Sequence, residues 1–276
     1  MNKTVEFVGQ KYRVNGIEMN VVIEGQGPDV LLVHGFPDSI AVWRNQIPAL
    51  VAAGYRVIAP DQRGFGLTEM PIATKDYAID NYVADLAALL DAIGVQKVRL
   101  VCHDWAAAVG WQFCMKHSDR VDRYVAIAVG HPTAYAHGSI KQKLKAYYII
   151  FFQIKGLSEW MVTRANWWLW RQMLRYDPEM PQWKEQLSRP GRLTAAINIY
   201  RANLNLMLPQ DWAKVTVPVM GVWGEGDVAL AEEQMIASKK YVTASWRYER
   251  IGNKAGHWLM LSNPEQFNPI LLDYLK

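Results

Sequence analysis

Residues 98–107 read Val98-Arg99-Leu100-Val101-Cys102-His103-Asp104-Trp105-Ala106-Ala107. The first half of this stretch is an apolar run with the length of a buried strand, and a helical pattern follows it as far as Lys116. Asp104 therefore lies where a strand turns sharply into a helix. Such a turn requires small neighbours on both sides, and Cys102 and Ala106 are small enough. This junction is a typical position for a catalytic nucleophile.

The position of Asp104 alone leaves two roles open. At a helix N-terminus the macrodipole stabilises an ionised carboxylate, which a nucleophile must be, but aspartate is also common there as a plain N-cap. A carboxylate nucleophile would attack an sp³ carbon that carries a leaving group, whereas serine or cysteine would indicate acyl transfer. The resulting alkyl ester needs a general base to activate water and donors to stabilise an oxyanion.

Candidates for these further groups follow other expected strands. His257, in Gly256-His257-Trp258, is the candidate base, and Asp227, in Gly224-Glu225-Gly226-Asp227, is the candidate orienting acid, with Glu225 as the fallback. A surface histidine and a turn aspartate are the simpler interpretations of each residue alone. The chain order nucleophile, acid, histidine nevertheless fits one catalytic unit. The expected oxyanion donors are the backbone N–H groups of Trp105 and of Phe36, in His34-Gly35-Phe36-Pro37.

Outside this stretch the chain alternates short β-branched runs with helical patterns, which predicts an α/β fold with a mostly parallel sheet flanked by helices. The expected strands are 29–33, 55–59, 98–102, 123–129, 217–223 and 245–251. The expected helices are 40–53, 80–93, 105–116, 231–239 and 264–275.

From about Pro132 to Trp212 no strand pattern is present, and aromatic-rich helical segments are broken by Gly and Pro. We therefore expect an α/β core, residues 1–131 and 213–276, interrupted by an all-α cap, residues 132–212. The cap is rich in tryptophan, which indicates either a helical core or the lining of an apolar pocket. Five tryptophans cluster in one region of it: Trp160, Trp167, Trp168, Trp170 and Trp183.

The composition is that of an ordinary globular protein: 51% hydrophobic and 20% charged residues, with a formal net charge of +4. No dense Lys/Arg run indicates a nucleic-acid partner. The two cysteines, Cys102 and Cys114, lack metal-ligand spacing and predict reduced thiols. No stretch has the length of a signal peptide or of a membrane span. We therefore expect a cytoplasmic protein, monomer or homodimer, without a membrane partner and without a metal.

The combination of motifs resembles the epoxide hydrolase and haloalkane dehalogenase branch of the α/β-hydrolase superfamily, along nearly the whole chain. The resemblance rests on His34-Gly35-Phe36-Pro37, Asp61-Gln62-Arg63-Gly64-Phe65-Gly66, His103-Asp104-Trp105 and Gly256-His257-Trp258. It implies the α/β-hydrolase fold, an oxyanion N–H from the first motif and a nucleophile at Asp104. Cys102 and Ala106 replace the usual glycines of the turn, and Met260 and Ser262 stand where epoxide hydrolases often have Gln and Glu.

Within this branch the cap residues favour an epoxide hydrolase. Such enzymes use two cap tyrosines to hold the epoxide oxygen and protonate the alkoxide, a poor leaving group that needs a proton donor. Tyr148 precedes Phe151-Phe152-Gln153, and Tyr200 lies in Asn198-Ile199-Tyr200-Arg201, both similar to the family contexts. Tyr147 is an alternative to Tyr148, and Tyr200 shares a helical face with apolar residues that could make it a core residue.

The resemblance thus implies hydrolysis of a small apolar epoxide by water, without a cofactor, with Phe36, Trp105, Tyr148 and Tyr200 around the substrate. The main alternative is a haloalkane dehalogenase, in which Trp105 would hold the halide; the paired tyrosines have no task in that reaction. A non-catalytic member that binds a small molecule is a third possibility, which the complete set of catalytic residues disfavours.

Overall fold

The computed structural model describes residues 7–175 and 177–276. Its centre is an eight-stranded sheet with the order β1-β2-β4-β3-β5-β6-β7-β8. Strands β3 to β8 run parallel, and β2 pairs antiparallel with both β1 and β4. The strands are β1 (Gln10–Val14), β2 (Ile17–Glu24), β3 (Asp29–Val33), β4 (Arg56–Pro60), β5 (Val98–His103), β6 (Val121–Ile127), β7 (Val219–Gly224) and β8 (Trp246–Ile251).

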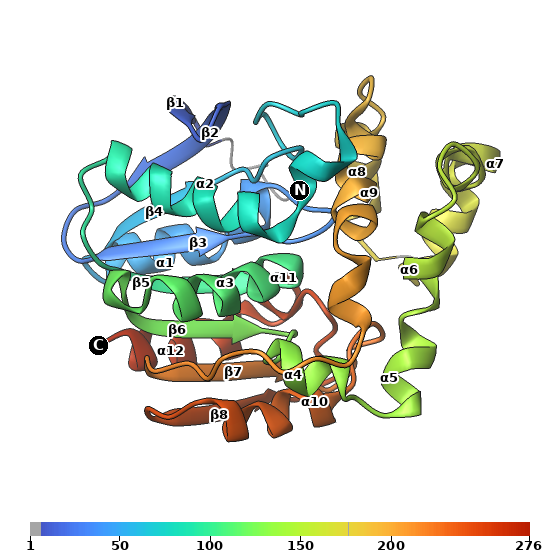
Figure 1. Ribbon diagram of the computed structural model, residues 1–276. Coiled ribbons are helices and arrows are strands. Elements are labelled where there is room, and N and C mark those ends of the chain that lie inside the picture. Colours follow the sequence, from blue (N-terminus) through green and yellow to red (C-terminus); the bar gives the residue numbers. More distant parts are fainter. Residues whose placement is uncertain (1–6, 176) are drawn as a thin grey trace.

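Helices cover both faces of this sheet (Figure 1). On one face α2 and α3 pack against each other, and on the other α1 contacts α12. The helices outside the segment between β6 and β7 are α1 (Gln46–Ala52), α2 (Ile79–Ala92), α3 (Trp105–Lys116), α10 (Glu232–Ala237), α11 (Leu259–Ser262) and α12 (Pro264–Leu275). The same part of the chain forms four short 3₁₀ helices: η1 (Ile40–Trp43), η2 (Thr74–Tyr77), η3 (Ser118–Arg120) and η5 (Ser238–Tyr241).

The mostly parallel sheet expected from the sequence is confirmed, and the expected helices 105–116 and 264–275 have the bounds of α3 and α12. The single helix expected over 40–53 is wrong, because the chain forms η1 and then α1, separated by Arg44 and Asn45. The sequence pattern also missed β1 and β2. Residues of β1 are mostly exposed, so this strand lacks the apolar run that marks a buried strand.

Between β6 and β7 the described residues form helices and no strand. They are α4 (Pro132–Ala136), α5 (Ile140–Lys145), α6 (Tyr147–Phe152), α7 (Leu157–Met173), α8 (Met180–Leu187), α9 (Arg192–Ala202) and η4 (Leu204–Met207). In Figure 1, α8 and α9 stand at the end of the sheet, and α5, α6 and α7 lie farther from it. These helices therefore lie over the carboxyl ends of the parallel strands, the edge at which α/β sheets place their ligands.

Candidate active site

Asp104 occupies a strained turn between β5 and α3. Its φ of 54° and ψ of −126° lie in a region that non-glycine residues rarely adopt, and such strain persists where surrounding structure imposes it. Its carboxylate makes no capping hydrogen bond to the helix, so the plain N-cap role is wrong. The side chain is instead held above the end of β5, buried but free to meet groups from other strands.

The loop after β3 approaches Asp104 so closely that it requires a glycine. A Cβ atom on Gly35 would lie 2.6 Å from the Asp104 Cβ and 2.5 Å from the His103 carbonyl oxygen. This approach brings the backbone N–H of Phe36 to 2.9 Å from Asp104 Oδ1, to which it donates. The backbone N–H of Trp105, the next residue, acts on the same carboxylate and lowers its pKa. Two N–H groups thus converge on the carboxylate, the geometry of an oxyanion hole.

His257 lies between two carboxylates. Its Nε2 is 3.3 Å from Asp104 Oδ2, and its Nδ1 is 2.8 Å from Asp227 Oδ2. The other Asp227 oxygen accepts backbone N–H groups from Ala229 and Leu230, both at 2.8 Å, so Asp227 both shapes its turn and holds the imidazole. The fallback acid Glu225 instead lies 3.2 Å from the Arg250 guanidinium. The structure therefore brings Asp104, His257 and Asp227 together.

The charges of this group stabilise each other. Burial disfavours the charged imidazole, but Asp227 and Asp104 outweigh it and raise the pKa of His257 to about 10. Burial likewise opposes the Asp104 carboxylate, but His257 and the Trp105 N–H hold its pKa below the ordinary value. The resting site therefore contains an ionised Asp104 beside a protonated His257.

The loop that carries Phe36 is fixed by buried polar contacts. His34 Nε2 accepts the backbone N–H of Gln62 at 3.0 Å, and burial holds the pKa of His34 below its usual value, so the ring is neutral. Asp61 accepts the N–H of Ile40 at 2.9 Å and the Asn20 side-chain amide at 2.9 Å. The Asp61–Gly66 motif thus supports the site without entering it.

Sequence reasoning missed Asp38, the residue after Pro37. Its carboxylate is buried and accepts two indole N–H groups, from Trp183 on α8 at 2.7 Å and from Trp258 at 2.8 Å. Burial raises the pKa of Asp38 to about 7 against the opposing effect of both indoles. One side chain therefore links the Phe36 loop, the His257 loop and helix α8. Its place after the HGFP motif was the only signal in the sequence.

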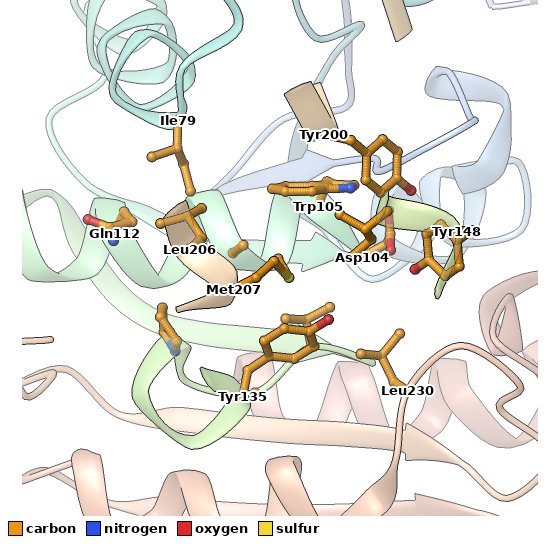
Figure 2. A pocket seen from close by; sticks show the side chains of 15 residues that line it. Ile79, Asp104, Trp105, Gln112, Tyr135, Tyr148, Tyr200, Leu206, Met207 and Leu230 are labelled. Atoms are coloured by element: carbon orange, nitrogen blue, oxygen red, sulfur yellow. The ribbon is translucent and has the colours of Figure 1, made fainter. Parts of the chain in front are cut away.

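Tyr148 on α6 and Tyr200 on α9 face Asp104 from the helices between β6 and β7 (Figure 2). Their ring centroids are 5.7 Å apart, and the ring of Tyr200 lies 5.1 Å from that of Trp105. Burial raises the pKa of both tyrosines well above the ordinary value, so both phenols keep their protons. The Trp105 and Tyr200 rings meet edge to face. Tyr147, by contrast, is 61% exposed.

Two cavities meet at Asp104, Tyr148 and Tyr200. The inner cavity, of about 60 Å³, extends past Trp105 and is mostly apolar (Figure 2). The outer cavity, of about 560 Å³, extends towards α5 and the end of α7 and contains His257. The inner walls include Ile79, Gln112, Tyr135, Leu206, Met207 and Leu230. Tyr135 is a third phenol in this cavity that no sequence signal had marked.

The tryptophans of residues 132–212 do not share one role. Trp167 and Trp183 are buried, as the core interpretation expects, and the buried Trp170 also lines the outer cavity. For Trp160 and Trp168, which are 53% and 56% exposed, neither the core nor the pocket interpretation is correct. Both interpretations came from the amino-acid composition, and composition does not distinguish an exposed tryptophan from a buried one.

The described residues contain neither a membrane-spanning helix nor a cluster of metal ligands. Between residues 7 and 276, residue 176 excepted, no helix combines the length and apolarity that crossing a bilayer requires. Over the same residues no group of three or more His, Cys, Asp or Glu side chains is arranged to hold a metal ion.

The chain is similar to known hydrolases in sequence and in structure. The α/β hydrolase fold family matches residues 28–153. An AB hydrolase superfamily protein of Bacillus subtilis is 31% identical over 97% of both chains. Epoxide hydrolase A of Mycobacterium tuberculosis is 30% identical over 95% of both. A solved epoxide hydrolase from Vigna radiata superposes with a TM-score of 0.83 at 30% identity, covering 99% of each chain.

Proposed function

The chain belongs to the epoxide hydrolase branch of the α/β-hydrolase superfamily, and we propose that it hydrolyses an epoxide to a vicinal diol through an ester on Asp104. The observation that carries this proposal is the meeting of an ionised Asp104, a protonated His257 and two protonated phenols at one junction of two cavities. The carboxylate and the two phenols have the protonation states that the first step requires, and His257 must lose its proton before the second.

In the first step Asp104 attacks an epoxide carbon. Because Oδ1 already accepts the Phe36 N–H, Oδ2 is the oxygen that forms the new C–O bond. The C–O bond of the epoxide breaks, and its electron pair goes to the epoxide oxygen, which takes a proton from Tyr148 or Tyr200. The product is an alkyl ester of Asp104 with a free hydroxyl on the neighbouring carbon, together with one tyrosinate.

The first step also prepares the base for the second. Asp104 is one of the two carboxylates that keep the pKa of His257 near 10, and ester formation removes its negative charge. The imidazolium therefore becomes more acidic when the ester forms and can return a proton to the tyrosinate. His257 is then neutral, which is the state that a general base requires.

In the second step neutral His257, oriented by Asp227, takes a proton from water as the water attacks the ester carbonyl carbon. Phe36 and Trp105 donate N–H groups to the oxyanion on Oδ1. Collapse of this intermediate breaks the bond between the carbonyl carbon and the alkyl oxygen, and the leaving alkoxide takes the proton of the new acid hydroxyl. The diol is released, and Asp104 is again a carboxylate beside a protonated His257. The protons balance over the cycle: one epoxide and one water give one diol.

We assign residues 132–212 to a cap over this site and infer that the substrate is apolar. The walls of the inner cavity are mostly apolar, and about 60 Å³ suits a small substituent on one epoxide carbon. The outer cavity, at about 560 Å³, takes the larger substituent. The epoxide itself would lie where the cavities meet, between Asp104 and the two tyrosines.

A haloalkane dehalogenase is the second candidate, and one observation favours it. The indole N–H of Trp170 is buried in the outer cavity wall and has no acceptor among the described residues, as a halide site requires. Against it, the Trp105 ring packs edge to face against the ring of Tyr200. The buried tyrosine pair also has no task in halide release.

Intact-protein mass spectrometry on a His257→Gln variant tests both candidates. Without the base the first step still runs, but the ester is not hydrolysed and accumulates. With an epoxide panel we expect a mass gain equal to the whole epoxide, located by peptide mapping on Asp104. A gain equal to an alkyl group, seen only with haloalkanes, would establish the dehalogenase instead.

The matched control is His137→Gln, which removes a half-exposed histidine outside both cavities. It should turn substrate over without accumulating an adduct. An adduct on a residue other than Asp104 would contradict the proposed nucleophile. Absence of any adduct with both panels, in a variant that remains folded, would contradict the ester mechanism.

A further inference from the structure

The outer side of helices α5 to α7 exposes an unusual number of large apolar side chains. Their exposed fractions range from 38% to 76%, and several follow each other at three- or four-residue spacing. In Figure 1 these helices form the side of the molecule farthest from the sheet. We call this surface the α5–α7 face. It comprises Ile140, Leu144, Tyr147, Ile150, Ile154, Leu157, Trp160, Met161 and Trp168. Soluble proteins rarely expose apolar side chains in such a group unless the surface binds something.

The same segment carries the positive charge of the protein. Residues 140–175 contain seven lysines and arginines and one acid, Glu159, a net charge of +6. Because the whole chain has a net charge of +4, the remainder has a net charge of −2. Glu159 pairs with Arg201 at 2.8 Å and is therefore not available to the seven cations. Within the described ranges none of these seven forms an ion pair with a carboxylate; they are Lys141, Lys143, Lys145, Lys155, Arg164, Arg171 and Arg175.

The face is continuous with the outer cavity. Leu144 and Tyr147 belong both to the face and to the cavity lining, and Lys141, Lys145 and Arg175 line the cavity on the same side. An apolar molecule that leaves this surface therefore meets the cavity directly.

From this arrangement we propose that the α5–α7 face docks on the surface of a bilayer that contains anionic phospholipids. Exposed tryptophans and aliphatic side chains enter the headgroup region, and flanking lysines and arginines meet the lipid phosphates, as in interfacial amphipathic helices. Docking places the outer cavity against the bilayer, into which apolar molecules partition. Binding to a bilayer requires no catalytic step, so it can be tested independently of the proposed hydrolysis of an epoxide.

Charge favours a membrane over a second copy of the chain. In a symmetric dimer the same patch meets itself, so exposed cations such as Lys143 and Arg164 would face their counterparts. Like charges at an interface oppose association. An anionic bilayer neutralises the same charges while it covers the apolar side chains. The occupant that fits both properties of the face is therefore an anionic lipid surface.

Vesicle flotation with the full chain tests this proposal. We expect the protein to float with phosphatidylcholine vesicles that contain about 30% phosphatidylglycerol, to release in high salt, and to stay behind with pure phosphatidylcholine. The variant Trp160→Ser/Trp168→Ser should lower the partition coefficient about tenfold or more, because two large apolar side chains no longer enter the bilayer. Neither tryptophan lines a cavity.

A second variant, Lys143→Gln/Arg164→Gln, removes charge and leaves the apolar side chains; it should weaken binding only to the anionic vesicles. The matched controls are Val8→Ser, at a side chain 87% exposed next to the edge strand β1, and Lys239→Gln/Lys240→Gln. Both should bind as the wild type does. Thermal melting confirms that each variant is folded.

Three results would overturn the proposal: no flotation with anionic vesicles, equal losses in the face variants and the controls, or equal binding to neutral vesicles. A dimer detected by sedimentation that the Trp160→Ser/Trp168→Ser variant abolishes, without vesicle binding, would assign the face to a second copy instead.

Discussion

At the scale of single residues, the proposed chemistry depends on two phenols that keep their protons. Tyr148 and Tyr200 are separated by 52 positions, yet α6 and α9 bring their rings within 5.7 Å of each other and both onto the cavity wall beside Asp104. Burial raises the pKa of each, which makes them weak acids in the resting enzyme but good partners for an alkoxide, a much stronger base.

We expect Tyr148→Phe and Tyr200→Phe each to reduce kcat for epoxides by about 10² to 10⁴, because each removes one donor to the developing alkoxide. The double variant should lose nearly all activity. Steady-state kinetics on one epoxide provides the measurement, and Tyr12→Phe, far from both cavities, is the control. If both single variants retained the wild-type kcat, neither phenol would donate the proton.

The residue scale also shows what the sequence could and could not predict. Asp104 and Asp227 could be predicted as candidates because they follow strands marked by apolar runs, and parallel strands end at one edge of the sheet. The strand before His257, β8, has charged residues among its apolar ones, so its signal is weaker. Asp38 and Tyr135 were missed because neither has a spacing or a periodic neighbour that distinguishes it. Their importance arises from contacts with residues far away in the chain, such as Trp258 with Asp38.

At the scale of elements, the sequence predicted that the segment between β6 and β7 is helical, but not where its helices break. The lack of strand patterns indicated an all-helical segment, but α7 is broken at Arg164–Trp167, where three consecutive residues, Ala165, Asn166 and Trp167, have positive φ. None of these is a glycine or proline, so no local signal marks the break. Tertiary contacts of the buried Trp167 and Trp170 accompany it.

Helix α8 is tied to the core through Asp38, and this contact can be tested. We expect Asp38→Ala to destabilise the protein by about 2–5 kcal/mol, because two buried indole N–H groups, of Trp183 and Trp258, lose their acceptor. Urea unfolding measures the change. Asp29→Ala, which breaks a partly exposed pair with Arg56, should cost no more than about 1 kcal/mol. Equal losses in the two variants would argue against a special role for Asp38.

At the scale of the whole molecule, charge and apolar surface are distributed unevenly. The expectation of no membrane partner rested on the absence of a spanning segment, and a spanning segment is a different feature from a docking surface. The overall composition does not show this asymmetry, because the net charge of +4 is the sum of +6 in residues 140–175 and −2 in the remainder. Only the exposure of Trp160 and Trp168 in the structure reveals that apolar and basic side chains share one surface.

The pH dependence of stability reports the charges at the centre of the molecule. Because the pKa of His257 is about 10 in the folded protein and 6.5 in its reference state, the folded protein binds this proton more tightly. The resulting stabilisation is complete below pH about 6.5 and is lost as the pH rises through about 10. It amounts to a few kcal/mol at most.

We therefore expect the difference in unfolding free energy between the wild type and His257→Gln to decrease steadily from pH about 6.5 to about 10. Urea unfolding at a series of pH values provides the measurement. Other titrating groups, such as Asp38, are present in both proteins and cancel in this difference. His137→Gln, at a half-exposed histidine, should track the wild type. A difference that stayed constant over this range would mean that His257 is neutral in the resting protein. In that case ester formation could not switch on the base, and the tyrosinate would have to recover its proton from solvent.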